Sequence, residues 1–225
     1  MKIAMEANGM SVLDHKEINE LNYWENKKKA EGVLSNDHYK YFYTTHFGLC
    51  DSYYDNKAVL DIGCGPRGSL EWAAMASRRI GLDPLANEYL RLGADRHQME
   101  YINAFSEHIP LEDGICNIVC AFNSLDHVEN VNQTLKEVKR VTHLGGFFLL
   151  LVEVNHPPTV CEPHALTPGK LIDALMPEFI CDRLQVHKPD GGLYNSVRTG
   201  EKLPQPEQTD QIGYLSAMFI RILPD

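Results

Sequence analysis

The residues with the clearest chemical potential in this chain form a glycine-rich segment, Asp61-Ile-Gly-Cys-Gly-Pro-Arg-Gly68. Glycines at this spacing let the chain turn tightly and let a ligand approach the bare backbone. Asp83 follows about twenty residues later, where a carboxylate accepts hydrogen bonds from ribose hydroxyls. These residues together predict a nucleotide-binding site.

The identity of that nucleotide depends on the residues around the glycines. The glycine spacing also matches the fingerprint of NAD enzymes, so the motif alone leaves two cofactors open. Asp61 lies where its carboxylate would repel a pyrophosphate but attract a methionine ammonium group. Arg67 could pair with a phosphate, whereas Pro66 lacks one of the amide donors that a pyrophosphate would use. The balance favours a ligand that carries an ammonium group.

A histidine is the best candidate for general-base catalysis. His127 follows the segment Asn123-Ser-Leu-Asp126, and a histidine side chain titrates near neutrality. Asp126 beside it would tune its charge. The alternative is that His127 caps or packs the helix that follows.

A proline-rich segment, 156–163, and the histidine after it contain side chains of types that bind zinc. They are His156, Cys161, Glu162 and His164. Because their spacing matches no familiar zinc motif, we predict no metal ion. We expect the segment to shape the substrate pocket, with His156, Glu162 and His164 as contacts.

Short apolar segments alternate with helical stretches from residue 57 onward, a rhythm that predicts crossover units and a parallel sheet. The expected strands are 58–62, 79–83, 99–105, 117–122 and 147–154. The expected helices are 69–77, 84–92, 131–142 and 167–175. Gly145 and Gly146 are expected to close the third helix.

Two late strands, near 179–187 and 214–222, are separated by the polar stretch 188–213, which shows no clear helix. They are expected to pair as an antiparallel hairpin. The predicted fold is therefore α/β: a Rossmann-like, doubly wound, seven-stranded, mostly parallel sheet with an antiparallel C-terminal hairpin. Ligands of such sheets lie outside the carboxyl ends of the strands.

The first fifty-six residues are rich in aromatic side chains, among them Tyr23, Trp24 and Tyr43. These side chains either seal N-terminal helices onto the core or line a substrate cavity. We predict a helical cap on the substrate side at 1–56, followed by a cofactor-binding domain at 57–225.

The charge of the chain limits its partners. The 225 residues include 31 Asp and Glu against 21 Lys and Arg, a net charge of −10. Such a chain is poorly suited to nucleic acid or to anionic membranes, so a small neutral or cationic substrate is expected. No apolar run reaches the roughly 20 residues of a membrane span, and the first residues lack a secretory signal, so a cytoplasmic location is expected. The sequence does not predict the oligomeric state.

Five segments occur in an order and spacing that resemble the class I S-adenosylmethionine-dependent methyltransferases. They are VLDIGCG at 59–65, GLDP at 81–84, SEHIPL at 106–111, NSLDHV at 123–128 and LKEVKRV at 135–141 with the glycines after it. The likeness covers a little under half of the chain, residues 57–154, and is greatest to the small-molecule branch with ubiquinone- and menaquinone-type enzymes.

The resemblance implies which residues contact S-adenosylmethionine. The expected contacts are Asp61, Gly63, Cys64, Gly65, Asp83, Pro84, Ser106, Glu107, Asn123 and Ser124. Asp61 and the glycines would hold the methionine and ribose parts, and Asp83 the ribose hydroxyls. Phe105 departs from the family, where many members have an aspartate that contacts adenine.

The resulting hypothesis is a methyltransferase that acts on an unidentified small molecule by in-line methyl transfer. An NAD-dependent oxidoreductase is an alternative, because the glycine motif permits it. A catalytically degenerate protein that binds S-adenosylmethionine is another, because the departure at Phe105 permits it.

Overall fold

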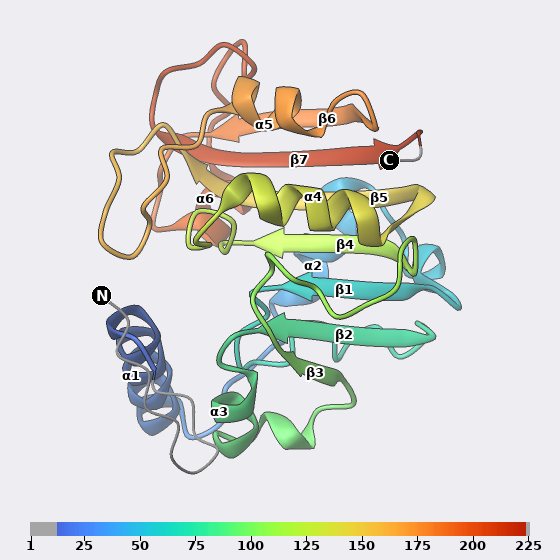
Figure 1. The fold of residues 1–225 in the computed structure, drawn as a ribbon. Coiled ribbons are helices and arrows are strands. Elements are labelled where there is room, and N and C mark those ends of the chain that lie inside the picture. The colour runs from blue at the N-terminus through green and yellow to red at the C-terminus, as the bar shows by residue number, and fades with distance from the viewer. Residues whose placement is uncertain (1–12, 224–225) are drawn as a thin grey trace.

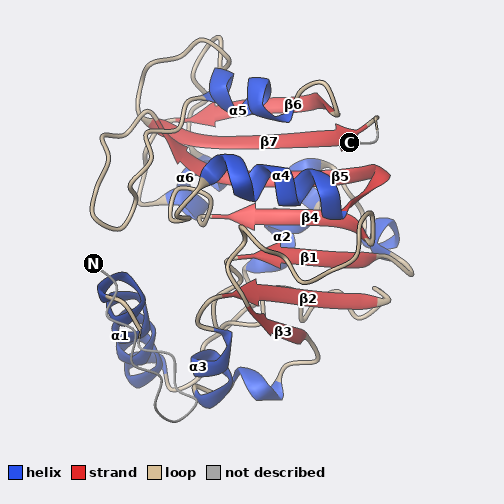
Figure 2. Cartoon of the chain, viewed as in Figure 1, coloured by secondary structure: helices blue, strands red, loops and turns tan. Residues whose placement is uncertain are grey.

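Seven strands form one sheet in the order β3-β2-β1-β4-β5-β7-β6 in the computed structural model, which describes residues 13–223. The strands are β1 (Ala58–Ile62), β2 (Arg78–Asp83), β3 (Glu100–Asn103), β4 (Cys116–Phe122), β5 (Thr142–Val154), β6 (Phe179–His187) and β7 (Gly213–Arg221). All neighbours pair in parallel except β7, which runs antiparallel to both β5 and β6 (Figure 2). This arrangement confirms the predicted fold.

Helices cover both faces of the sheet. They are α1 (His15–Glu31), α2 (Tyr39–Tyr43), α3 (Ala86–Arg91), α4 (Val131–Val141), α5 (Pro168–Leu175) and α6 (Leu193–Thr199), with short 3₁₀ turns η1 (Thr45–Phe47), η2 (Asp51–Tyr54) and η3 (Ala94–Arg96). In Figure 1, α4 and α5 lie on one face and α2 and α6 on the other. No helix among residues 13–223 is long and apolar enough to cross a membrane.

The central strands are apolar because both of their faces are covered. Every residue of β1 is buried, and alternate side chains enter different clusters. Leu60 and Ile62 pack with Val138 of α4, whereas Val59 packs with aromatic residues of the N-terminal segment such as Tyr54. The ends of these strands are thereby fixed by two layers of packing.

Residues 69–77 form consecutive turns, so the helix predicted there was wrong. The amides of Glu71, Ala73 and Ala76 each donate to the carbonyl three residues earlier. Residues 69–77 lead the chain back along β1, whose five residues span about 16 Å. As an α-helix these nine residues would cover about 13–14 Å. As 3₁₀-like turns they cover more, at about 2 Å per residue, and so match the length of the strand.

Two further predictions about local structure were wrong. Helix α4 ends at Val141 and β5 begins at Thr142, so Gly145 and Gly146 do not close the helix. They lie in a bulge, between the pairs Cys116–Thr142 and Ile118–Phe147, where the register of β4 and β5 shifts. A helix, α6, occurs within 188–213. Its two buried apolar residues, Leu193 and Val197, lie one turn apart, and this pattern is too short to indicate a helix.

Helix α1 lies outside the sheet, across the carboxyl ends of its strands (Figure 1). It begins with a capping box in which Asp14 and Glu17 satisfy each other's backbone amides. None of its residues is fully buried, and Arg67 holds its last turn through two hydrogen bonds of 2.8 Å to Glu31. The division into 1–56 and 57–225 stays a prediction, and residues 1–12 lie outside the described part.

Candidate functional site

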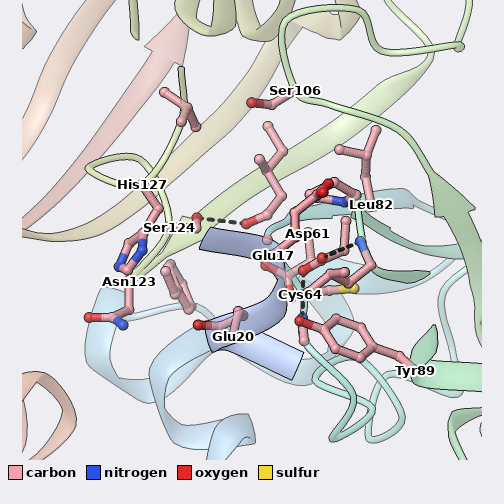
Figure 3. A pocket seen from close by; sticks show the side chains of 18 of the residues that line it. Glu17, Glu20, Asp61, Cys64, Leu82, Tyr89, Ser106, Asn123, Ser124 and His127 are labelled. Atoms are coloured by element: carbon pink, nitrogen blue, oxygen red, sulfur yellow. Dashed lines mark hydrogen bonds between the residues drawn. The ribbon is translucent and has the colours of Figure 1, made fainter. Parts of the chain in front are cut away.

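A cavity of about 480 Å³ lies between the carboxyl ends of β1, β2 and β4 and the inner side of α1. Figure 3 shows side chains from the strand ends and from α1 facing one another across it. All ten residues predicted to contact the cofactor line this cavity, as do Tyr23, Trp24, Tyr43 and His127. The structure thus brings together most of the predicted site, although binding at these residues stays a prediction.

The glycine loop after β1 passes too close to a neighbouring loop for any side chain. Gly63 has φ +69°, and a Cβ there would lie 2.3 Å from the Cβ of Ser124. Its amide donates to the carbonyl of Leu82 at 2.8 Å. The loop is therefore held against the end of β2, and its glycines expose backbone atoms to the cavity.

Asp61 is buried at the end of β1. The Tyr43 hydroxyl donates to its Oδ2 at 2.8 Å, and the Ser69 hydroxyl donates to the same oxygen. Burial raises the pKa of Asp61 to about 6, against the lowering effect of these hydrogen bonds. Tyr43 therefore orients this carboxyl, besides lining the cavity.

Asp83 ends β2 and is likewise buried. Its Oδ1 accepts from the Leu85 amide at 2.9 Å and its Oδ2 from the Gly65 amide at 3.2 Å. Burial raises the pKa of Asp83 to about 7, and the nearby carboxyls of Glu20 and Asp61 raise it further. This carboxyl is fixed in direction and easily protonated.

The segment after β3 is tied to α4. Glu107 Oε1 accepts from the Asn130 amide at 2.8 Å, and the hydroxyls of Ser106 and Thr134 lie 2.9 Å apart. Phe105, the departure from the family pattern, lines the cavity and is 50% exposed. The apolar ring of Phe105 thus lines the cavity at the position where many members of the resembled family have an adenine-binding aspartate.

The turn after β4 is bound to its neighbouring strands. Asn123 has φ +57°, and its amide donates to Leu151 of β5 at 2.7 Å. The Ser124 hydroxyl donates to the carbonyl of Ile62 at 2.7 Å. These bonds set the wall of the cavity opposite α3.

The predicted residues of the 156–164 segment lie beside the cavity and do not line it. Glu162 approaches His127, with 3.7 Å between Oε1 and Nε2. His164 Nε2 donates to the carbonyl of Val128 at 2.8 Å. His156 is buried and donates through Nδ1 to Pro157 at 2.9 Å. The substrate role of these three residues stays a prediction.

Sequence reasoning missed several lining residues. Glu17 and Glu20 enter from α1, and Tyr194 enters from α6. The capping box Asp14–Glu17 could have indicated where α1 begins and hence which residues share its inner face. No local pattern could have found Tyr194, because its helix was not predicted.

The cavity is strongly acidic. The carboxyl groups along its lining belong to Asp14, Glu17, Glu20, Asp61, Asp83, Glu107 and Glu129. Among the described lining residues, Lys16 contributes the single ammonium group, which lies 3.8 Å from Glu129 and donates to the carbonyl of His127. The cavity therefore favours a cationic ligand over a pyrophosphate.

Comparisons with known proteins agree with this geometry. Residues 60–150 match a family described as a methyltransferase domain. The chain is 30% identical over 112 residues to a sterol 4-C-methyltransferase of Caenorhabditis elegans, covering 45% of this chain and 33% of that protein. The chain thus spans about a third of the length of the curated relative it matches.

Solved structures share the fold. A geranyl diphosphate C-methyltransferase of Streptomyces coelicolor, in complex with Mg²⁺, geranyl diphosphate and S-adenosylhomocysteine, superposes with a TM-score of 0.63 at 14% identity, over 93% of this chain and 98% of that one. An S-adenosylmethionine-dependent methyltransferase of Mesorhizobium loti gives 0.57 at 18% identity, over 78% and 100%. Residues 60–150 are thus similar in sequence to a methyltransferase domain, and the chain shares its fold with solved S-adenosylmethionine-dependent methyltransferases.

Proposed function

We propose that this chain transfers the methyl group of S-adenosylmethionine to a small molecule. The observation that carries the proposal is the acidic cavity, with Asp83 fixed at the end of β2. S-adenosylmethionine has a sulfonium and an ammonium group against one carboxylate, so its net charge complements this lining. The two phosphates of NAD would meet repulsion there, which disfavours the oxidoreductase alternative.

In this proposal each part of the cofactor contacts a different group of lining residues. Asp83 accepts from the ribose hydroxyls, and Asp61 with the loop from Gly63 to Gly65 receives the methionine part. Ser106 and Glu107 face the adenine, with Phe105 supplying an apolar surface beside it. The turn at Asn123 and Ser124 places the sulfonium toward His127.

The reaction is a displacement at the methyl carbon. An electron pair of the acceptor attacks that carbon, and the carbon–sulfur bond breaks. The electrons of that bond stay on sulfur, which becomes neutral in S-adenosylhomocysteine. The protein contributes mainly by holding the two reactants in line and excluding water. His127, which lines the cavity, is our candidate to receive the proton of a hydroxyl acceptor, in line with the expectation from the sequence.

The acceptor side supports a small molecule. Tyr23 and Trp24 of α1 and Tyr194 of α6 supply aromatic surface to the cavity. The net charge of −10 opposes nucleic acid as an acceptor. The relative from Caenorhabditis elegans is named for a sterol, also a small molecule, and the segment 1–56 would cover such a substrate.

Transfer of labelled methyl groups tests this proposal. The chain is incubated with methyl-labelled S-adenosylmethionine and a cell extract, which is then separated into low-mass and macromolecular fractions. We expect label in the low-mass fraction, with Asp83→Ala reducing it at least tenfold. Label confined to protein or nucleic acid would contradict the small-molecule acceptor. Cofactor binding without any transfer would favour the degenerate alternative.

A further inference from the structure

The loop after β4 buries a carboxyl oxygen that makes no hydrogen bond. Asp126 is 1% exposed, and no residue within 13–223 makes a hydrogen bond to its Oδ1. A carboxylate without a partner is costly to bury, and such groups in folded proteins are usually paired or bound to a metal ion. This oxygen therefore requires an explanation that packing alone does not supply.

Two more ligand-type atoms lie close to it. His127 Nε2 is 3.9 Å from Asp126 Oδ1 and 3.7 Å from Glu162 Oε1, and all three atoms lie within 4.8 Å of one another. A point equidistant from atoms so separated lies no more than about 2.5 Å from each, near the bond lengths of divalent cations. A small closure of either loop would shorten these distances further.

A simple ion pair does not account for the cluster. Hydrogen bonds between imidazole and carboxylate span about 2.7–2.9 Å, so the imidazole at 3.7 and 3.9 Å bonds to neither carboxylate. Burial raises the pKa of Tyr214, and the carboxyls of Glu153, Glu162 and Asp126 raise it further, so Glu153 lies near the cluster. The imidazole of His156 also lies near Asp126 and Glu153. Three carboxyls are thus set against two imidazoles, and this excess of carboxyl groups attracts a cation.

The cluster is built from two loops that are tied together. Asp126 and His127 follow β4, where the His127 amide donates to the carbonyl of Ser124 at 3.1 Å. Glu162 follows β5, where its amide donates to the Thr159 hydroxyl at 2.9 Å. His164 joins the second loop to the first through its bond to Val128. The three ligands are therefore held at neighbouring positions before any ion binds.

We propose that Asp126, His127 and Glu162 bind one divalent transition-metal ion, of the Zn²⁺ or Mn²⁺ type. One imidazole nitrogen and two carboxylate oxygens suit these ions, and three protein ligands leave a coordination position open. His127 lines the cofactor cavity, as does Cys161 beside Glu162, so the proposed site borders the cavity. This site departs from the sequence prediction, which expected no metal and considered a different set of residues.

The open position suits an oxygen of the methyl acceptor, in a hydroxyl, carboxylate or phosphate group. That part of the inference rests on the proposed function, whereas binding of the ion does not. A histidine that binds the ion through Nε2 does not accept a proton there. The ion would instead lower the pKa of an acceptor hydroxyl bound to it, and the proton of that hydroxyl would pass to solvent water before methyl transfer.

Metal titration tests the site without any assay of activity. Protein freed of metal with a chelator is titrated with Mn²⁺, and free Mn²⁺ is followed by electron paramagnetic resonance, with Zn²⁺ as competitor. We expect one Mn²⁺ per chain, bound at least tenfold more weakly by Asp126→Asn and by Glu162→Gln. Glu129→Gln is the matched control, since it removes a carboxylate from the same loop outside the cluster and is expected to change the affinity less than twofold.

Far-ultraviolet circular dichroism and thermal unfolding of the two variants show that they remain folded, so this test depends neither on cofactor binding nor on methyl transfer. No stoichiometric Mn²⁺ or Zn²⁺ binding, or equal affinities in the unaltered chain and in both folded variants, would overturn the metal site. With either result, His127 would again be the candidate for the general base.

Discussion

At the scale of single residues, the glycine loop owes its shape to one close approach. Alanine at Gly63 would place its Cβ 2.3 Å from that of Ser124, in a backbone conformation with φ +69°. We expect Gly63→Ala to lower the free energy of unfolding by the about 1–2 kcal/mol of the left-handed conformation and by about 2 kcal/mol more for the collision. Denaturant unfolding measures the sum of these two losses.

Gly145 supplies the matched control. It has φ +79° but nothing within 4 Å of an added Cβ, so Gly145→Ala should lose only the conformational part. Equal losses in the two variants would mean that the contact with Ser124 does not constrain the loop.

The raised pKa of Asp83 predicts a pH dependence of cofactor binding. The carboxyl has a pKa of about 7 in the folded chain, and its ionised form accepts from ribose hydroxyls. Binding therefore releases a proton below that pKa, and affinity should fall as the pH is lowered, by up to about tenfold per unit.

Calorimetric titration with S-adenosylhomocysteine between pH 8 and pH 6 measures this effect, with Asp83→Asn as the comparison. The variant should bind more weakly and vary less with pH. An affinity of the unaltered chain that stays constant over this range would contradict the role of Asp83.

The sequence predicted most of the residues at the strand ends that line the cavity, because strand ends are local features. Asp61, the glycines and Asp83 each follow an apolar strand, and parallel strands bring such positions to one edge. The pairing of Glu162 with His127 could not be predicted, because it depends on how two loops approach across the sheet. The orienting bond from Tyr43 to Asp61 depends likewise on tertiary packing.

At the scale of elements, α1 packs over the glycine loop. A Cβ at Gly65 would lie 3.3 Å from the Trp24 ring, so this ring packs over the glycine loop. Trp24 Nε1 also donates to Glu20 at 2.7 Å. Because no residue of α1 is fully buried, its loss from the cavity should affect binding more than folding.

We expect Trp24→Ala to weaken S-adenosylhomocysteine binding by about tenfold, or 1.4 kcal/mol, as measured by calorimetry. Asn22→Ala changes an exposed residue of the same helix outside the cavity and should leave the affinity unaltered. Equal affinities in both variants would show that α1 does not cover the cofactor.

The elements that sequence analysis predicted incorrectly share a physical cause. Residues 69–77 have helical composition, but nine α-helical residues are shorter than β1, so this segment returns through 3₁₀-like turns, which are longer per residue. Helix α6 shows no amphipathic pattern long enough to detect and is held by packing on the sheet. The bulge at Gly145 reflects the register between β4 and β5, which no local pattern determines.

At the scale of the whole molecule, the sheet gathers acidic side chains at one edge and α1 adds more. The strand order was within reach of prediction, because crossover units favour parallel neighbours and the last two strands lack a crossover helix of ordinary length. The enclosure of the edge by α1 was expected only in outline. We expect the acidic lining of this cavity to favour a cationic nucleoside over a dinucleotide.

Calorimetric titration of the chain with S-adenosylmethionine, S-adenosylhomocysteine and NAD, repeated with Asp83→Ala, tests the central claim most directly. We predict that both adenosyl ligands bind one per chain, that Asp83→Ala weakens both at least tenfold, and that NAD does not bind. Binding of NAD alone would contradict the assignment of the cavity to S-adenosylmethionine.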